Sequence, residues 1–415
     1  MQTESTNNEK FLTKPLIIIF ITVFIDLVGF GIVIPALPFY VESDLFRATP
    51  FEIGILFASY SLMQFIFSPV LGSLSDRYGR RPILFFSIIG SAIGYLFIGF
   101  AFALWMVFAG RIISGITGGN ISTAQAYIAD VTTRENRAKG MGLFGATFGL
   151  GFIFGPAIGG ILSKFGTHVP FFFVSALALA NAITLYFVLP ESHKPNKNEE
   201  IRQNRIIELV VSLKDSRFGL VTLLYFLVIV AFSIMTTTFV QYTMYRFGYN
   251  AEQNGYLFAY VGVLAILIQG GIFARLVDKF GEIWLIVVGC ILLAGSFFAI
   301  PYVGPFSGGL TALLVGIAFF SIGNSLASPA LTSLASKEAH DEAQGKTLGI
   351  LQSAASLARA IGPALSAFLL YSAAAPENID DYTLFRTFWT AAAIMLLAVF
   401  IAIYFVKTER EKILA

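Results

Sequence analysis

The chain has 415 residues, of which 56% are hydrophobic and only 13% are charged, and its formal net charge is +2. A soluble domain carries about 25% charged residues, so this composition excludes a water-soluble globular protein. The chain has one cysteine, Cys290, which excludes an intrachain disulfide and is expected to be a buried, inert thiol.

Apolar runs as long as a membrane-spanning helix, about 20 residues, recur along the whole chain. The first run follows Pro15 and is too long for a cleaved signal peptide, so we expect it to be a retained span. The pattern predicts an all-α integral membrane protein with twelve spans, at 15–40, 52–74, 82–101, 104–128, 139–162, 170–190, 217–243, 253–276, 283–302, 308–334, 346–370 and 383–406.

The distribution of basic residues predicts the orientation of these spans, because cytoplasmic loops are enriched in Lys and Arg. Basic residues gather in 77–81, 134–139 and 194–217, which all fall on one side of the membrane. The loops of the other side contain only Arg47, Lys164 and Arg246. The pattern therefore places both termini in the cytoplasm and the protein in the cell (inner or plasma) membrane.

The polar stretch 191–217 separates the spans into two groups of six. Its apolar residues Ile206, Leu209, Val210 and Leu213 share one helical face, which predicts either a helix on the membrane surface or a solvated linker. The expected domains are an N-terminal six-helix bundle, 1–190, a cytoplasmic linker, 191–217, and a C-terminal six-helix bundle, 218–415.

The two halves contain similar segments in the same order. The segment DRYG at 76–79 recurs as DKFG at 278–281, and the Gly-Pro pair at 155–156 recurs at 362–363. Weak internal repeats of this kind are typical of membrane transporters.

The loop GSLSDRYGRRP at 72–82 contains the densest charge between two spans. Gly72 permits close helix packing, Gly79 permits a tight turn, and Asp76 is placed to meet the N-terminal dipole of span eleven. We interpret the loop as an inner gate that joins the halves when the protein opens outward. A topology signal is the alternative, but it explains only the arginines. The gate residues from this loop are Gly72, Asp76, Arg77, Gly79, Arg80 and Arg81.

Asp26 is the one acidic residue, of 25, that falls in the middle of a predicted span. It follows Pro15 by 11 residues, or about 16 Å of helix, roughly half of the apolar core. A carboxyl group there can be neutral or ionised, as proton coupling requires. Arg111 has a similar depth and is the expected partner of Asp26 in proton coupling. A structural acid hydrogen-bonded between helices is the alternative.

Other polar side chains within the spans are candidates for lining a central substrate cavity, although hydrogen bonding between helices is the alternative for each Asn or Gln. They are Gln64, Asn120, Gln125, Gln241, Tyr242, Gln269, Asn324, Gln352 and Arg359.

Three motifs resemble those of the major facilitator superfamily. They are the loop at 72–82, GRIISGITGG at 110–119, and GLGFIFGPAIGG at 149–160, which is similar to the fifth-span motif of drug–proton antiporters. Within that group the chain is most similar to the tetracycline exporters. The resemblance implies two pseudo-symmetric six-helix bundles that work by alternating access, with Asp130 as the inner-gate partner of Arg80. It also implies an antiporter motif formed by Gly151, Gly155, Pro156 and Gly159.

The chain departs from the tetracycline exporters at three places. Gly94 stands where they have an acid in span three, Ala265 stands where they have a histidine, and no acid occurs in span nine between Trp284 and Ile300. Recognition of a tetracycline–metal complex is therefore in question, and a different amphipathic compound fits equally well.

The expected function is proton-coupled export of a small amphipathic compound, tetracycline-like or related, and a neutral or singly cationic compound suits a single acid. The alternatives are a proton symporter, an exporter of an endogenous metabolite, and a membrane sensor that would not need Asp26. The sequence lacks a phosphate loop, a metal-ligand cluster and a nucleophile elbow, so we expect no enzyme, cofactor or metal. The expected partners are substrate, protons and the lipid bilayer, with no nucleic acid, and the functional unit is expected to be a monomer.

Overall fold

A computed structural model describes residues 13–193, 216–338, 344–372 and 379–414. In that part of the chain, ten helices are long and apolar enough to cross a membrane. Two further rods complete the set of twelve predicted spans: the broken rod α4–η1–α5, and α6, whose apolar part is shorter. The predicted linker 191–217 falls mainly on residues outside those that the structure describes.

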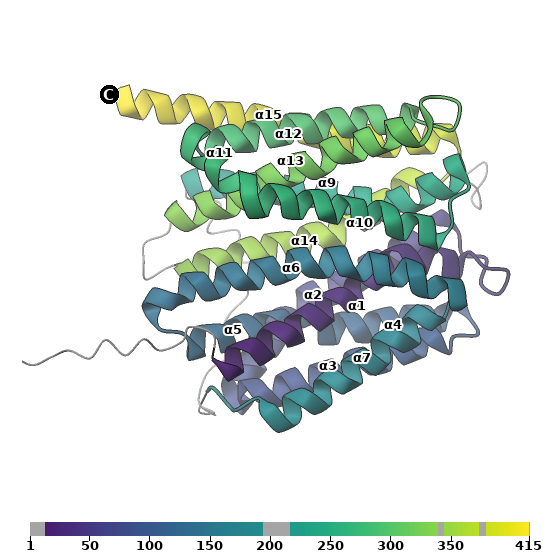
Figure 1. Ribbon diagram of the computed structural model, residues 1–415, viewed down its shortest axis with the longest axis vertical. Helices are drawn as coiled ribbons and strands as arrows, with labels where there is room; N and C mark the ends of the chain where they lie inside the picture. The colour runs from purple at the N-terminus through teal and green to yellow at the C-terminus, as the bar shows by residue number, and fades with distance from the viewer. Residues whose placement is uncertain (1–12, 194–215, 339–343, 373–378, 415) are drawn as a thin grey trace, which may run out of the picture.

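The first six rods form the N-terminal half of the molecule, and Figure 1 shows them below the others. They are α1 (Lys14–Val41), α2 (Pro50–Tyr78), α3 (Arg80–Gly99), the broken rod α4 (Leu104–Thr117), η1 (Gly118–Asn120) and α5 (Ile121–Val131), then α6 (Arg134–Leu162) with the turn η2 (Ser163–Phe165), and α7 (Val169–Val188).

The other six rods form the C-terminal half, with α14 next to the N-terminal half (Figure 1). They are α9 (Ser216–Phe247), the rod α10 (Ala251–Leu267), η3 (Ile268–Ile272) and α11 (Phe273–Phe280), then α12 (Glu282–Ala299) with the turn η4 (Ile300–Tyr302), α13 (Gly309–Glu338), α14 (Gln344–Leu370) and α15 (Asp381–Leu414).

The second rod of each half begins and ends with matching local chemistry. Thr49 and Glu52 form a capping box at the start of α2, and Asn250 and Gln253 form one at the start of α10. The rods end at Gly79 and Gly281, with φ of 101° and 76°. Both glycines adopt extended backbone with positive φ that only glycine tolerates. The repeated DRYG and DKFG segments therefore encode the same turn twice.

The bundle has two ends, which we name by their residues. The termini face carries Lys14, Gly79 and Lys407, and the opposite face carries Val41 and Pro50. Figure 1 shows the start of α1 and the end of α15 at the same end of the bundle.

The two halves meet backbone to backbone near the opposite face. A Cβ atom added at Gly54 would lie 2.5 Å from Ala367 Cβ, and one added at Gly160 would lie 2.8 Å from Gly255 Cα. The Phe51 ring packs edge to face on Phe368 with centroids 5.3 Å apart. Contacts this close exist only because small residues let the helices approach, which is how membrane helices associate without a hydrophobic driving force.

An ion pair joins the halves at the same end. Lys164 Nζ lies 2.6 Å from Glu252 Oε1, and Tyr256 Oη donates a hydrogen bond of 2.6 Å to the same carboxylate. The hydrogen bond from Lys164 to Glu252 raises the pKa of the Lys164 amine. Together with the glycine contacts, this pair closes the opposite face in the structure.

We expect Gly160→Ala to separate the halves at the opposite face, because the new methyl group would meet the Ala251 carbonyl oxygen and Gly255 Cα, both at 2.8 Å. Overpacking of this kind costs about 1–3 kcal/mol. The distance between spin labels at Phe165 and Tyr245 should lengthen in a larger share of the molecules. Gly149→Ala is the matched control on the same helix, because nothing lies within 4 Å of its added Cβ. Equal label distances in both variants would contradict this role of the glycine contact.

Candidate functional site

The fourth rod of the N-terminal half is interrupted at its middle. Gly118 and Gly119 lower its helical propensity, and the chain forms the 3-10 segment η1 between α4 and α5. Gly119 packs against the backbone of α2, where an added Cβ would lie 2.8 Å from Ser68 N. The break leaves the Gly118 carbonyl free to accept a hydrogen bond of 2.9 Å from Gln64 Nε2. It also presents Asn120 to α1.

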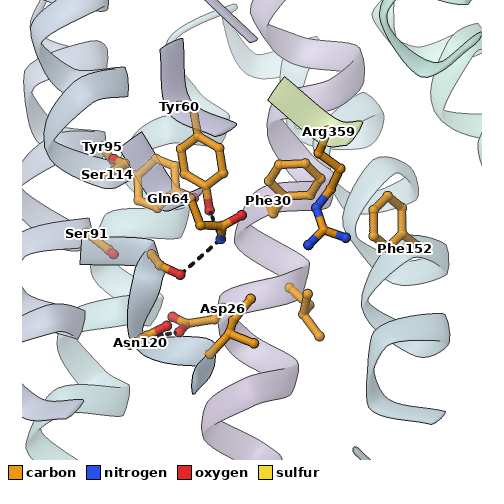
Figure 2. A pocket seen from close by; sticks show the side chains of 13 residues that line it. Asp26, Phe30, Tyr60, Gln64, Ser91, Tyr95, Ser114, Asn120, Phe152 and Arg359 are labelled. Carbon is orange, nitrogen blue, oxygen red and sulfur yellow. Dashed lines mark hydrogen bonds between the residues drawn. The ribbon is translucent and has the colours of Figure 1, made fainter. Parts of the chain in front are cut away.

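Asp26 lies on α1 opposite this break. Asn120 Nδ2 donates a hydrogen bond of 2.7 Å to Asp26 Oδ2 (Figure 2). Asp26 lines a pocket whose walls come from α1, α2, α3, the broken fourth rod and α6 of the N-terminal half, and to which α14 of the C-terminal half contributes Arg359 (Figure 2). The lining residues are Asp26, Leu27, Phe30, Tyr60, Gln64, Ser91, Tyr95, Ser114, Gly118, Asn120, Ile121, Phe152 and Arg359.

The expected pairing of Asp26 with Arg111 is absent from the described residues. Arg111 is fully buried, its Nε donates to the Leu56 carbonyl oxygen at 3.3 Å, and its guanidinium carbon lies 4.3 Å from the Tyr60 ring centroid. Its Nη1 and Nη2 atoms have no hydrogen-bond partner. The ring of Tyr60 therefore holds this cation by a cation–π contact behind the pocket wall, while Asn120 is the partner of Asp26.

Three of the predicted cavity residues, Gln64, Asn120 and Arg359, line the pocket with Asp26. Sequence reasoning missed the aromatic walls, because Phe and Tyr occur throughout apolar spans. The remaining predicted cavity residues are not among those that line it: Gln125, Gln241, Tyr242, Gln269, Asn324 and Gln352.

Contacts inside the C-terminal half account for three of these absences. Tyr242 is buried, and its hydroxyl donates to the carbonyl oxygens of Ile300 at 2.9 Å and Val303 at 2.7 Å. Gln241 Nε2 donates to the Thr237 carbonyl oxygen at 3.3 Å, and Gln269 Nε2 donates to Ser325 Oγ at 3.4 Å. All three groups therefore bond within their own half, but only the Gln269 bond, from η3 to α13, joins two helices as the alternative for Asn and Gln predicted, because the Gln241 bond lies within α9.

The pocket is small in this conformation. Its volume of about 40 Å³ is enough for roughly three water molecules. A drug-sized compound therefore needs a wider pocket than the one described. Across the described residues no group of three or more His, Cys, Asp or Glu side chains could hold a metal ion.

Close helix packing fills the place of the missing third-span acid. A Cβ added at Gly94 would lie 2.2 Å from Ser114 Oγ and 2.8 Å from the Gly110 carbonyl oxygen. The contact between α3 and α4 leaves no room for a carboxylate there, so Asp26 is the pocket's single acid.

The charged loop at 72–82 forms an ion cluster on the termini face. Arg80 is buried and bonds to three groups: Asp76, Asp130 through Nε at 3.1 Å, and Ser75 Oγ through Nη1 at 2.7 Å. The structure thus contains the Arg80–Asp130 pair that the resemblance implied. Ser192 Oγ also donates to Asp130, at 3.1 Å.

Glu191 completes the cluster, and sequence reasoning did not find it. Its carboxylate accepts hydrogen bonds from the backbone N–H groups of Arg80 at 2.9 Å and Arg81 at 3.1 Å. The first N–H groups of a helix have no carbonyl partner within the helix itself, so the Glu191 carboxylate caps α3 and complements its dipole. Gly79 lies against Glu191.

Among the described residues, the inner-gate side chains of Asp76 and Arg80 have their partners within the N-terminal half. Gly72 packs near Ser122 of α5, and the guanidinium of Arg77 lies 5.5 Å from the Tyr78 ring. The first side chains of α14, the expected partner, lie outside the described residues.

The predicted antiporter motif packs directly on α1. A Cβ atom added at Gly151 would lie 2.4 Å from Leu27 Cβ, and one added at Gly155 would lie 2.6 Å from Gly31 Cα. One added at Gly159 would lie 2.6 Å from the Ile32 carbonyl oxygen. Pro156 approaches Gly31 as well. The motif therefore fixes α6 against the helix that carries Asp26.

We expect Gly79→Ala to destabilise the protein more than Gly281→Ala. Both variants force an extended backbone with positive φ on alanine, which costs about 1–3 kcal/mol. Only at Gly79 would the new Cβ meet a side chain, Glu191, with Oε2 at 2.5 Å, whereas nothing lies within 4 Å at Gly281. Displacing that carboxylate removes a helix cap worth about 1 kcal/mol. SDS-driven unfolding should show the extra loss, and equal losses would rule out the cap.

Comparison with known proteins places the chain in a family. The family model described as Major Facilitator Superfamily matches residues 19–363, with a second match over 272–414. The class H tetracycline resistance protein of Pasteurella multocida is 35% identical, covering 95% of this chain and 96% of the relative. Multidrug resistance protein 2 of Bacillus subtilis (strain 168) is 29% identical, covering 88% of this chain and 90% of the relative.

A solved structure shows the same fold. The peptide transporter POT in complex with sulfate superposes with a TM-score of 0.76 at 15% identity, covering 95% of this chain and 94% of that one. With twelve rods among its described residues, the chain is a multi-pass membrane protein that belongs to the Major Facilitator Superfamily, a family of transporters rather than enzymes.

Proposed function

We propose that the protein is a proton-coupled exporter of small amphipathic drugs that works by alternating access. The observation that carries this proposal is the single carboxyl group of Asp26 at the wall of a pocket in the N-terminal half that Arg359 of the C-terminal half also lines. An acid within a membrane bundle is costly and typical of proton pathways. One group that binds either a proton or substrate couples the two movements.

The direction of transport rests on orientation and on the relatives. The bias of Lys and Arg supports a cytoplasmic termini face. The ion pair and the glycine contacts between the halves lie near the opposite face, which supports a conformation closed to the outside. The named relatives are drug resistance proteins, which supports export. Asp26 and Arg359 come from the two halves of one chain, so a monomer contains the whole site.

Arg111 has an indirect part in this proposal. Its guanidinium lies against the ring of Tyr60, and the Tyr60 hydroxyl accepts a hydrogen bond from Gln64 Nε2. Tyr60 and Gln64 both line the pocket with Asp26. Because the Tyr60 ring rather than Asp26 holds this cation, substrate that reaches Asp26 has no Asp26–Arg111 ion pair to break.

Asp26→Asn should abolish drug accumulation driven by a pH gradient, because a neutral amide cannot release a proton. The measurement is transport into or out of proteoliposomes for a panel of amphipathic drugs that includes tetracycline. Asp44→Asn is the control, since it removes an exposed loop carboxylate. If the Asp26→Asn variant still concentrates drug against its gradient, Asp26 is excluded as the coupling group.

Topology is tested by labelling intact cells with a membrane-impermeant maleimide. His168→Cys at the opposite face should react, and Tyr78→Cys at the termini face should react only after the cells are permeabilised. Both positions are exposed, and the native Cys290 is buried, so background is low. The reverse pattern would invert the proposed direction.

A further inference from the structure

The pocket contains two opposite charges that do not neutralise each other. Asp26 bonds to Asn120, and the described residues contain no ion pair between Asp26 and Arg359. The two side chains enter from different halves, Asp26 from α1 and Arg359 from α14. Figure 2 shows them at separate places on the pocket wall.

Arg359 is poorly satisfied for a cation at this depth. Within the described part of the chain, its side chain donates one hydrogen bond, from Nη2 to Ser356 Oγ at 3.2 Å, on its own helix. No carboxylate within the described ranges pairs with it. A guanidinium carries five N–H donors in a planar fork that matches a carboxylate, so most of its donors remain available.

Aromatic rings line the same pocket as the two charges. Phe30, Phe152 and Arg359 line the pocket together (Figure 2), and the two phenylalanine rings pack edge to face on each other with centroids 5.6 Å apart. Tyr60 packs on Phe30 with centroids 5.4 Å apart. Such walls suit a flat aromatic body and screen both charges from water, which strengthens their pull on a ligand.

We propose that the pocket selects zwitterionic aromatic amphiphiles, with the acidic group of the substrate on Arg359 and its cationic group on Asp26. The proposal rests on the proposed export function and replaces the sequence-based expectation of a neutral or singly cationic substrate. A cationic group at Asp26 competes with a proton, as antiport requires. The acidic group of the substrate pairs with Arg359, which keeps its positive charge. A compound without an acidic group therefore leaves Arg359 without a partner of opposite charge.

The experiment measures binding to purified protein without a pH gradient, by quenching of intrinsic fluorescence. The probes are ciprofloxacin, which carries one carboxylate and one protonated amine, and its ethyl ester, which keeps the amine and the aromatic body. The variants are Arg359→Gln and the charge-conserving Arg359→Lys. Ser356→Ala tests whether the intrahelical hydrogen bond matters.

We expect wild-type protein to bind the acid at least tenfold more tightly than the ester. Arg359→Gln should remove that preference by weakening only the acid, whereas Arg359→Lys and Ser356→Ala should keep most of it. Equal wild-type affinity for the two probes, no binding of the acid, or an equal loss for both probes in Arg359→Gln would overturn the proposal. A chain that prefers the acid but shows no pH-driven transport would refute the export function alone.

Discussion

The contact on which the rest of the structure depends is the backbone packing of α6 on its two neighbours. Gly155 lies against Gly31 of α1, and Gly160 lies against Gly255 of α10. One helix therefore fixes the rod that carries Asp26 and also holds the two halves together. Because the contact is made by glycines, it has no flexible side chain that could absorb a change in spacing. A shift of the halves at the opposite face is consequently transmitted to α1 and to the pocket.

The two halves share a frame but differ in their charges. Each has a capped second rod and a glycine turn, at Gly79 and Gly281. In the N-terminal half the turn supports a buried arginine, Arg80, held by two carboxylates and one hydroxyl. In the C-terminal half Glu282 instead pairs with Lys337 and accepts a hydrogen bond from Ser333 at 3.1 Å. The internal repeat thus conserves backbone geometry, while the polar chemistry has diverged between the halves.

The spans were predictable because a span is a run of consecutive apolar residues and can be read directly from the sequence. Side-chain partners were not, because they depend on how the helices pack. Asp26 could be found from its depth alone. Its partner could not, because Arg111 and Asn120 lie on the same broken rod and only the turn at η1 determines which one reaches α1. Tyr242 was misplaced for a similar reason, since sequence does not reveal which face of a buried helix meets the cavity. The Glu191 cap joins residues more than a hundred positions apart.

A pocket that holds a few waters must widen to admit a drug, and the charges indicate how. Asp26 and Arg359 lie on different halves, so separating the halves moves them apart without breaking an ion pair between them. A directly bonded pair would resist this movement, because parting two buried charges leaves both uncompensated. With Asn120 on Asp26 and Ser356 on Arg359, each charge keeps its own partner during the movement. A substrate that bridges both charges would instead draw the halves together around itself, so occupancy of the pocket favours the state in which it is enclosed.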